Sequence, residues 1–203
     1  MRRKMNLVIA LLAMVAMLAS CKPDPAPTVK AWDGSVDKAW YNESAASFEI
    51  SKASELAGLA SLVNGGTTFE GKSLILKSDL DLANLEWTPI GQKAGNKFAG
   101  SFDGQNHTIS NLKITPNEAI AKEDTFDGYA ALFGAMDGGT IKNVKVSGSV
   151  EGKNVAGLLA RMDSGLVENC ISYVAVVGTG KAGGIVCLTN NMGCTIQNCT
   201  NEG

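Results

Sequence analysis

The sequence predicts an all-β fold, a parallel β-helix (solenoid) with one N-terminal capping helix. A block of sequence recurs three times, with Ala131, Gly157 and Gly184 at equivalent positions 26 and 27 residues apart. Each copy holds short alternating runs of β-branched residues between glycines, as in Val144–Val146, and lacks the apolar period of a helix. Repetition at this period indicates a solenoid, in which coils lie about 4.8 Å apart and equivalent residues stack.

Aligning the copies produces columns of equivalent residues. The apolar columns are Leu132, Leu158 and Ile185, then Phe133, Leu159 and Val186, and later Ile141, Val167 and Ile196. A column of asparagines follows, formed by Asn111, Asn143, Asn169 and Asn198. Asparagine tolerates the left-handed conformation and its amide can bond along the stack, so we interpret this column as a structural turn ladder. The residue after each asparagine is expected to point inward, and a ligand site on this row is the alternative.

Residues 1–20 have the pattern of a lipoprotein signal peptide. The basic residues 2–4 precede an apolar run, 7–18, that is too short to span a membrane. The segment ends in Leu18-Ala19-Ser20-Cys21, which resembles the lipobox after which a cysteine is exposed and lipidated. Acyl chains contribute about 0.8 kcal/mol per buried methylene, so more than one chain on Cys21 would anchor the protein to the lipid bilayer. An ordinary secretory signal with a chance cysteine is the alternative.

Residues 21–31 form a Pro-rich tether that is expected to be extended and semi-rigid. Three of the 18 basic residues and none of the 20 acidic ones lie in the signal segment, so the rest of the chain has a net charge near −5. This charge argues against nucleic acid as a partner, because its binding requires a basic patch.

Residues 32–72 are predicted to be a lead-in that includes the capping helix, SKASELAGLASLVN, at 51–64. Its apolar face is formed by Leu56, Leu59, Leu62 and Val63. Ser51 is expected to cap its N-terminus, and Gly65-Gly66 ends it. A solenoid needs a cover over its open sheet edge, and we assign the helix to that role.

Residues 73–203 hold the β-helix repeats, beginning with the alternating strand SLILKSDLDL, 73–82. Asp79 and Asp81 are candidates for a hard cation such as calcium, and solvated carboxylates are the alternative. Residues 115–127 are polar and aperiodic and are predicted to be a protruding loop. The last copy stops just after its asparagine turn without a capping element, so the natural chain is expected to continue beyond Gly203 or to be truncated there.

Two longer motifs combine these features. They are FAGSFDGQNHTISNL at 98–112, and ALFG at 131–134 followed by TIKNV at 140–144. With the upstream pieces SELAGLASLVNGG, DLDL and WTPIG, they resemble the GLUG-motif repeat domains of Bacteroidetes surface lipoproteins, which also occur in the non-catalytic part of IgA-specific metallopeptidases. The resemblance covers residues 40–203 and implies a right-handed β-helix, an adhesin-type binding role and no catalytic residues. One departure is that the GLFG box reads ALFG, GLLA and GIVC here, which keeps size and apolarity.

The residues predict no enzyme and no cofactor. The single histidine, His107, excludes a two-histidine HExxH metal site and is interpreted as a turn residue. Glycoside hydrolysis needs two carboxyls about 5–9 Å apart, and stacking could bring Asp137 near Asp103 or Asp163. These aspartates precede glycine or serine-glycine, which is ordinary turn chemistry, so no catalytic residue is assigned.

Four cysteines lie in the repeats: Cys170, Cys187, Cys194 and Cys199. Cys170 and Cys199 share a column, so a disulfide between stacked coils and free buried thiols both fit the sequence, and we favour the thiols. Trp87 and Tyr173 are interpreted as packing residues, because aromatic residues are too sparse to outline a sugar-stacking platform.

The sequence therefore predicts a lipoprotein of the bacterial cell envelope, anchored through Cys21 in the outer membrane and exposed at the surface. Its β-helix is expected to be a non-enzymatic binding module for a host or glycan ligand. A structural stalk for a further C-terminal domain is one alternative, and a carbohydrate-active β-helix enzyme is another.

Overall fold

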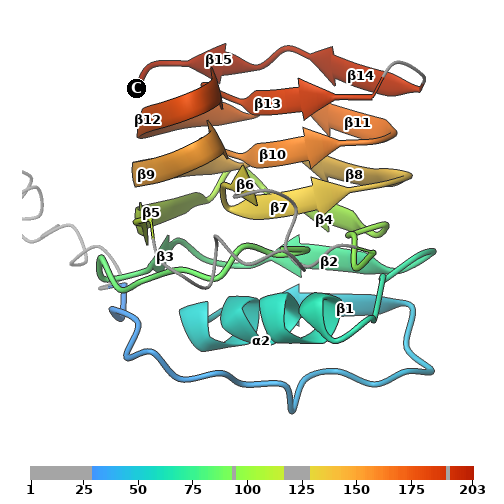
Figure 1. Cartoon of the computed structure of the whole chain (residues 1–203). Helices are drawn as coiled ribbons and strands as arrows, with labels where there is room; N and C mark the ends of the chain where they lie inside the picture. Colours follow the sequence, from blue (N-terminus) through green and yellow to red (C-terminus); the bar gives the residue numbers. More distant parts are fainter. Residues whose placement is uncertain (1–28, 93–94, 117–128, 191–192) are drawn as a thin grey trace, which may run out of the picture.

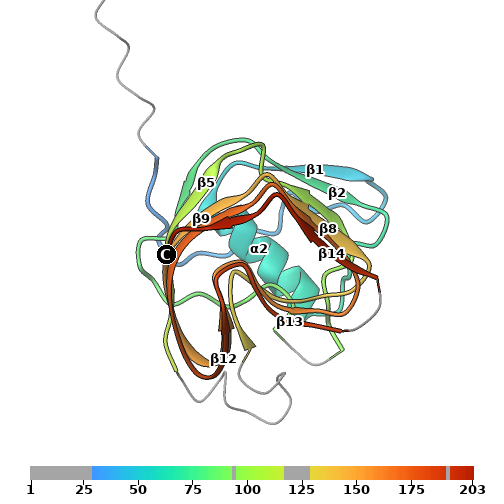
Figure 2. The same ribbon diagram turned by 90° about the horizontal axis from the view of Figure 1, so that it is seen from above.

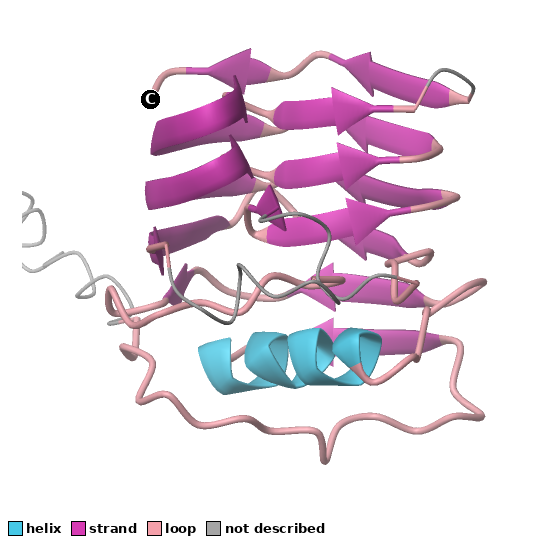
Figure 3. Ribbon diagram, viewed as in Figure 1, coloured by secondary structure: helices cyan, strands magenta, loops and turns pink. Residues whose placement is uncertain are grey.

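The computed structural model describes residues 29–92, 95–116, 129–190 and 193–203. The predicted parallel β-helix is confirmed, because these residues wind through about five coils (Figures 1 and 3). One α-helix of the described chain lies across the first coil. Viewed along its axis, the stack is a ring of walls with this helix beneath it (Figure 2).

Three walls of parallel strands build the coils. The first wall holds β1 (Ser47–Ile50), β2 (Ser73–Leu76), β4 (Ser101–Asp103), β8 (Gly139–Lys142), β11 (Gly165–Glu168) and β14 (Cys194–Gln197). The second holds β7 (Phe133–Met136), β10 (Leu159–Met162) and β13 (Val186–Thr189). The third holds β3 (Leu80–Asp81), β5 (Thr108–Ile114), β9 (Lys145–Ala156), β12 (Ile171–Gly183) and β15 (Thr200–Asn201), with β6 (Tyr129–Ala130) paired to β9. Each strand therefore bonds to its equivalents one coil away.

Strand register confirms the predicted apolar columns. Leu159 pairs with Phe133 on one side and with Val186 on the other. In the first wall Val167 pairs in the same way with Ile141 and with Ile196, the equivalent residue of the last coil. The side chains of Phe133, Ile141, Leu159 and Val167 are fully buried, so these columns form the core.

The asparagine turns are left-handed, as predicted. Asn143, Asn169 and Asn198 have φ angles of 54°, 53° and 54°. They stack because the strands before and after each turn are paired in register. The Nδ2 of Asn169 donates to Oδ1 of Asn143 at 3.3 Å, and Nδ2 of Asn143 donates to Oδ1 of Asp103 at 2.9 Å. The column is thus a turn ladder that continues downward into an aspartate.

Asn111 lies outside this column, so its predicted place there is wrong. Asp103 pairs with Lys142 and Thr108 pairs with Lys145, so four residues of the lower coil occupy the turn that two residues make above it. The partner of Ile141 is Phe102, whereas Ile109 pairs with Val146, so Asn111 lies within β5 at the register shift between Ile109 and Leu112. There it has a φ of 57°, and its Nδ2 donates to Oδ1 of Asp81 at 2.8 Å.

The helix α2 (Ala53–Asn64) begins later than predicted, and Ser51 is not its cap. The N-cap residue is Lys52, and the carboxylate of Glu55 accepts the backbone N–H groups of Ser51 and Lys52 at 2.7 and 3.1 Å. The Glu55 carboxylate thus satisfies the backbone N–H groups just before the helix, and its charge complements the positive end of the helix dipole.

Helix α2 covers the lower end of the stack, as expected for a lid (Figure 1). Its residues Leu56, Leu59 and Val63 are fully buried in the same core cluster as the coil interior. Gly58 lies where the lead-in crosses the helix, and a Cβ there would overlap the carbonyl oxygen of Asp37. The glycine is therefore needed for close backbone approach.

The opposite end of the stack presents strand edges. Strands β13, β14 and β15 are each the last of their wall, and Ile196 on β14 is 44% exposed. Cys21 and most of the predicted loop 115–127 lie outside the described residues. Within the described part of the chain, no helix has the length and apolarity needed to cross a bilayer.

Candidate binding site

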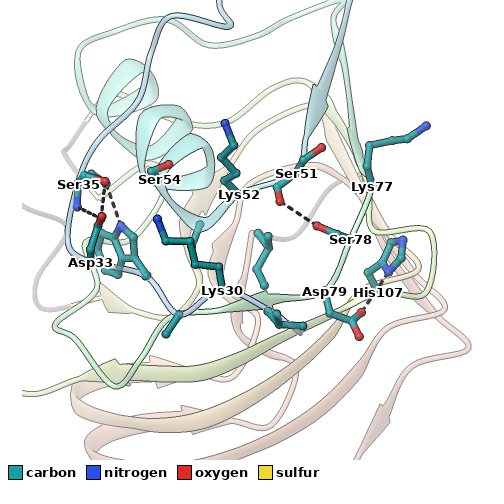
Figure 4. Close-up of a pocket in the computed structure, with 15 residues that line it drawn as sticks. Lys30, Asp33, Ser35, Ser51, Lys52, Ser54, Lys77, Ser78, Asp79 and His107 are labelled. Atoms are coloured by element: carbon teal, nitrogen blue, oxygen red, sulfur yellow. Dashed lines mark hydrogen bonds and ion pairs between the residues drawn. The ribbon is translucent and has the colours of Figure 1, made fainter. Parts of the chain in front are cut away.

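A cavity of about 500 Å³ lies beside the capping helix (Figure 4). Three segments line it: residues 29–33 and Ser35 of the lead-in, residues 51–54 at the start of α2, and residues 77–80, which lead from β2 into β3. His107 joins them from the turn before β5. Parallel pairing of β2 on β1 and of β5 on β3 brings these turns to one side of the molecule.

Trp32 forms a rigid apolar surface in this cavity. Its backbone N–H donates to the carbonyl of Asp81 at 2.8 Å, and its indole Nε1 donates to the carbonyl of Ser35 at 2.8 Å. Its ring meets Trp87 edge to face at a centroid distance of 5.7 Å. Trp87 is buried and donates Nε1 to Leu132 O at 3.1 Å, so its predicted packing role is confirmed. The half-buried indole of Trp32 is therefore fixed in orientation.

Three exposed lysines, Lys30, Lys52 and Lys77, contribute positive charge to the lining. The Nζ of Lys52 lies 3.5 Å from Glu55, and that of Lys77 lies 3.2 Å from Glu49. The Lys77–Glu49 pair is exposed on both sides, and such pairs contribute about 0–1 kcal/mol, so the Lys77 ammonium group can turn toward a ligand at little cost.

Two carboxylates balance part of this charge. Oδ1 of Asp79 accepts the backbone N–H of Thr108 at 2.9 Å and lies 3.1 Å from Nδ1 of His107, and the Thr108 bond is the main cause that lowers the pKa of Asp79. The carboxylate of Asp33 accepts hydrogen bonds from the hydroxyl and the backbone N–H of Ser35, which lower its pKa. Both groups are therefore anionic acceptors at neutral pH.

Serine hydroxyls complete the lining. Ser35, Ser51, Ser54 and Ser78 all border the cavity. The Oγ of Ser78 donates to the carbonyl of Ser51 at 2.8 Å, which ties the β2–β3 turn to the start of the helix. With charges of both signs, hydroxyls and one indole, the site suits a ligand rich in hydroxyl groups better than a simple ion.

The predicted cation candidates Asp79 and Asp81 are engaged elsewhere. Asp79 holds the His107–Thr108 turn, and Oδ1 of Asp81 accepts the N–H of Ala83 at 2.7 Å as well as the amide of Asn111. Among the described residues, no group of three or more His, Cys, Asp or Glu side chains is placed to hold a metal ion.

Asp137 and Asp163 are brought together, as their stacking suggested. The Nζ of Lys97 lies 3.2 Å from Asp137 and 2.6 Å from Asp163, and Nε of Arg161 donates to Asp163 at 2.7 Å. Burial opposes ionisation of Asp163, but the hydrogen bonds from Lys97 and Arg161 outweigh it and lower its pKa. The arrangement is that of a structural ion-pair group and not that of a catalytic acid–base pair. Asp103 is not part of this group. It lies at the end of β4 in the first wall and belongs to the turn ladder.

The four repeat cysteines are free thiols in this structure. Cys170 is buried, and Cys187, Cys194 and Cys199 are half-buried. The packing interpretation of Tyr173 is wrong, because this residue is 41% exposed on the outer face of β12.

Comparison with known proteins adds one similarity. No protein-family model matches the chain, and no solved structure does so either. The chain is 33% identical to halomucin of Haloquadratum walsbyi over 147 residues, which cover 65% of this chain. The matched region is 2% of halomucin, so the chain spans a very small part of that protein.

The lining of the cavity was not predicted. The sequence predicts a tether over residues 21–31 and does not indicate Trp32 as a binding residue. The available signal was the segment Trp32-Asp33-Gly34-Ser35, which places an aromatic residue beside a turn. Its partners come from turns that are distant in sequence.

Proposed function

We propose that this chain is a lipid-anchored protein of the bacterial cell envelope whose β-helix binds a glycan without catalysing a reaction. The cavity beside the capping helix carries the proposal. It combines the fixed indole of Trp32 with four serines, three lysines and two aspartates. Sugars present both an apolar ring face and many hydroxyls, and pockets recognise such ligands with an aromatic surface and a few directed polar groups.

The envelope location is supported by the N-terminal sequence. A basic segment, a short apolar run and Leu18-Ala19-Ser20-Cys21 precede a Pro-rich tether, which is the order expected for an acylated surface protein. The resemblance to GLUG-motif repeats of surface lipoproteins supports the same location and an adhesin-type role.

A glycan screen with a matched variant tests the binding site. The folded protein is screened against polysaccharides, including those of bacterial envelopes, and the best ligand is titrated by calorimetry. We expect Trp32→Ala to weaken binding by about two- to twelvefold, since an aromatic ring contact contributes roughly 0.5–1.5 kcal/mol beyond the area that it buries. Tyr173→Ala, which removes an exposed aromatic from another wall, is the control and should bind like the wild type.

Two outcomes would contradict the proposal. One is a screen in which no glycan binds at millimolar concentration. The other is an unchanged affinity in Trp32→Ala. The appearance of new reducing or unsaturated sugar ends during incubation would show instead that the protein is an enzyme.

The lipid anchor is tested separately through Cys21. The native protein, extracted from its membranes, should have the intact mass of a chain that begins at Cys21 and carries acyl groups. The Cys21→Ser variant should remain uncleaved or leave the detergent phase, because the acylated thiol is the anchoring group. An unmodified Cys21 in the native protein would contradict acylation without affecting the test of the cavity.

A further inference from the structure

Cys170 and Cys199 occupy equivalent positions in consecutive coils. Glu168 pairs with Gln197 before them, and Ile171 pairs with Thr200 after them, so the two cysteines lie directly beside each other. Neighbouring parallel strands are about 4.8 Å apart, which falls within the Cα separation of about 4.4–6.8 Å that disulfides span.

Their side chains also have the same orientation. The Sγ of Cys170 donates to the carbonyl of Glu168 at 3.2 Å, and the Sγ of Cys199 donates to that of Gln197 at 3.3 Å. Each thiol also lies 3.8 Å from one carbonyl of the coil below, that of Ile141 or Val167. Both thiols therefore point inward from one corner of the ring and stack along the axis.

The other two cysteines have no such partner. Cys194 pairs with Gly165. The neighbours of Cys187 on β13 pair with Leu159 and Arg161, which places Cys187 beside Ala160. Among the described cysteines, only Cys170 and Cys199 are stacked.

We propose that Cys170 and Cys199 form a disulfide between the last two coils when the protein meets a small-molecule disulfide or a disulfide oxidoreductase. The proposal does not depend on the glycan site. It assigns the pair as a redox modification site, of which the structure shows the reduced form.

The reaction begins at Cys199. Cys199 is half-buried, whereas Cys170 is fully buried. Burial raises the pKa of the Cys170 thiol to about 12, so Cys199 is the better nucleophile. The thiolate of Cys199 attacks the oxidant disulfide, forms a mixed disulfide and releases one thiolate. Cys170 then loses its proton and attacks the Sγ of Cys199, which releases the second thiolate. The two protein thiols lose two electrons and two protons, and the oxidant becomes two thiols.

The bond would hold the edge coil in place. It closes the segment 170–199, which contains β12, β13 and β14. Among the described residues, β13, β14 and β15 each pair with one neighbouring strand, so the coil that they form has fewer contacts that resist local opening. A cross-link to the coil below restricts that opening.

Mass spectrometry tests the pairing directly. The folded full-length protein is incubated with oxidised glutathione, remaining thiols are alkylated in denaturant, and the product is digested with trypsin. Cleavage after Arg161 and Lys181 places Cys170 alone in one peptide and the other three repeat cysteines in the next. We expect these two peptides to be joined and their mass to be lower by two hydrogen atoms than that of the reduced pair.

Variants identify the partner of Cys170. The double variant C187S/C194S should form the same cross-link, and C199S should not. Hydrogen exchange of residues 194–201 in the oxidised protein should slow by about tenfold or more. Cys170 alkylated in the oxidised protein, glutathione retained on Cys199, or a cross-link that survives in C199S would each overturn the proposal.

Discussion

Replacing Asn143 by glycine and by alanine separates the two roles of the turn ladder. Asn143 lies in its middle, with a φ of 54° and side-chain hydrogen bonds to Asp103 below and Asn169 above. Glycine keeps the left-handed backbone at no steric cost and removes only the side-chain bonds. Alanine removes the bonds and places a Cβ in the left-handed region.

The expected losses of stability follow from these contacts. Each side-chain hydrogen bond contributes about 1 kcal/mol net, so Asn143→Gly should lower the free energy of unfolding by about 1–2 kcal/mol. The left-handed conformation costs a residue such as alanine a further 1–2 kcal/mol or so, so Asn143→Ala should lose about 2–4 kcal/mol. The difference between the variants isolates the backbone contribution.

Urea unfolding followed by circular dichroism measures both values. Asn169→Gly and Asn169→Ala provide a matched pair one coil higher, where φ is 53°, and the alanine variant should again be the less stable. Equal stability of the glycine and alanine variants would refute the backbone argument. A glycine variant as stable as the wild type would show that the amide ladder contributes nothing.

Two further predictions concern the capping helix and the ion pairs of Asp163. Gly58→Ala should lower the melting temperature, although alanine favours helices by about 1 kcal/mol, because its Cβ would overlap the Asp37 carbonyl; a rise would show that the lead-in does not pack there. The lowered pKa of Asp163 means that its pairing stabilises the fold above the unfolded pKa of about 3.9 and that this contribution is lost as pH falls toward the folded pKa. Urea titrations across this range should show a steeper loss in the wild type than in Asp163→Asn, and parallel curves would contradict the assigned pairing with Lys97 and Arg161.

The repeat columns were predictable because one physical cause sets both sequence and structure. Stacked coils place equivalent residues in identical surroundings, so apolar residues recur wherever a wall faces the core, as Phe133, Leu159 and Val186 do. The same reasoning failed at Asn111. The similarity of TISN to TIKN aligned Ile109 with Ile141, whereas in the structure Phe102 pairs with Ile141 and Ile109 pairs with Val146.

The end of the helix and the cavity were less predictable, for a different reason. Both a serine hydroxyl and a glutamate carboxylate can satisfy the first N–H groups of a helix, and the sequence SKASE offers both. In the structure the carboxylate of Glu55 accepts the backbone N–H of Ser51 at 2.7 Å, and Ser51 does not cap the helix. The cavity depends on where the lead-in crosses the helix. The lead-in is not repeated in the sequence, so the repeat pattern cannot predict its path.

The position of the cavity also limits where the proposed ligand would be found. Val29, in its lining, is eight residues from Cys21. A fully extended chain spans at most about 3.6 Å per residue, so acylation of Cys21 would hold this residue within roughly 29 Å of the bilayer. At that distance the cavity faces glycans of the envelope itself more readily than those of a distant surface. Envelope polysaccharides and lipid-linked glycans therefore belong in the first binding screen, and binding by soluble host glycans alone would argue that the tether does not end in the membrane.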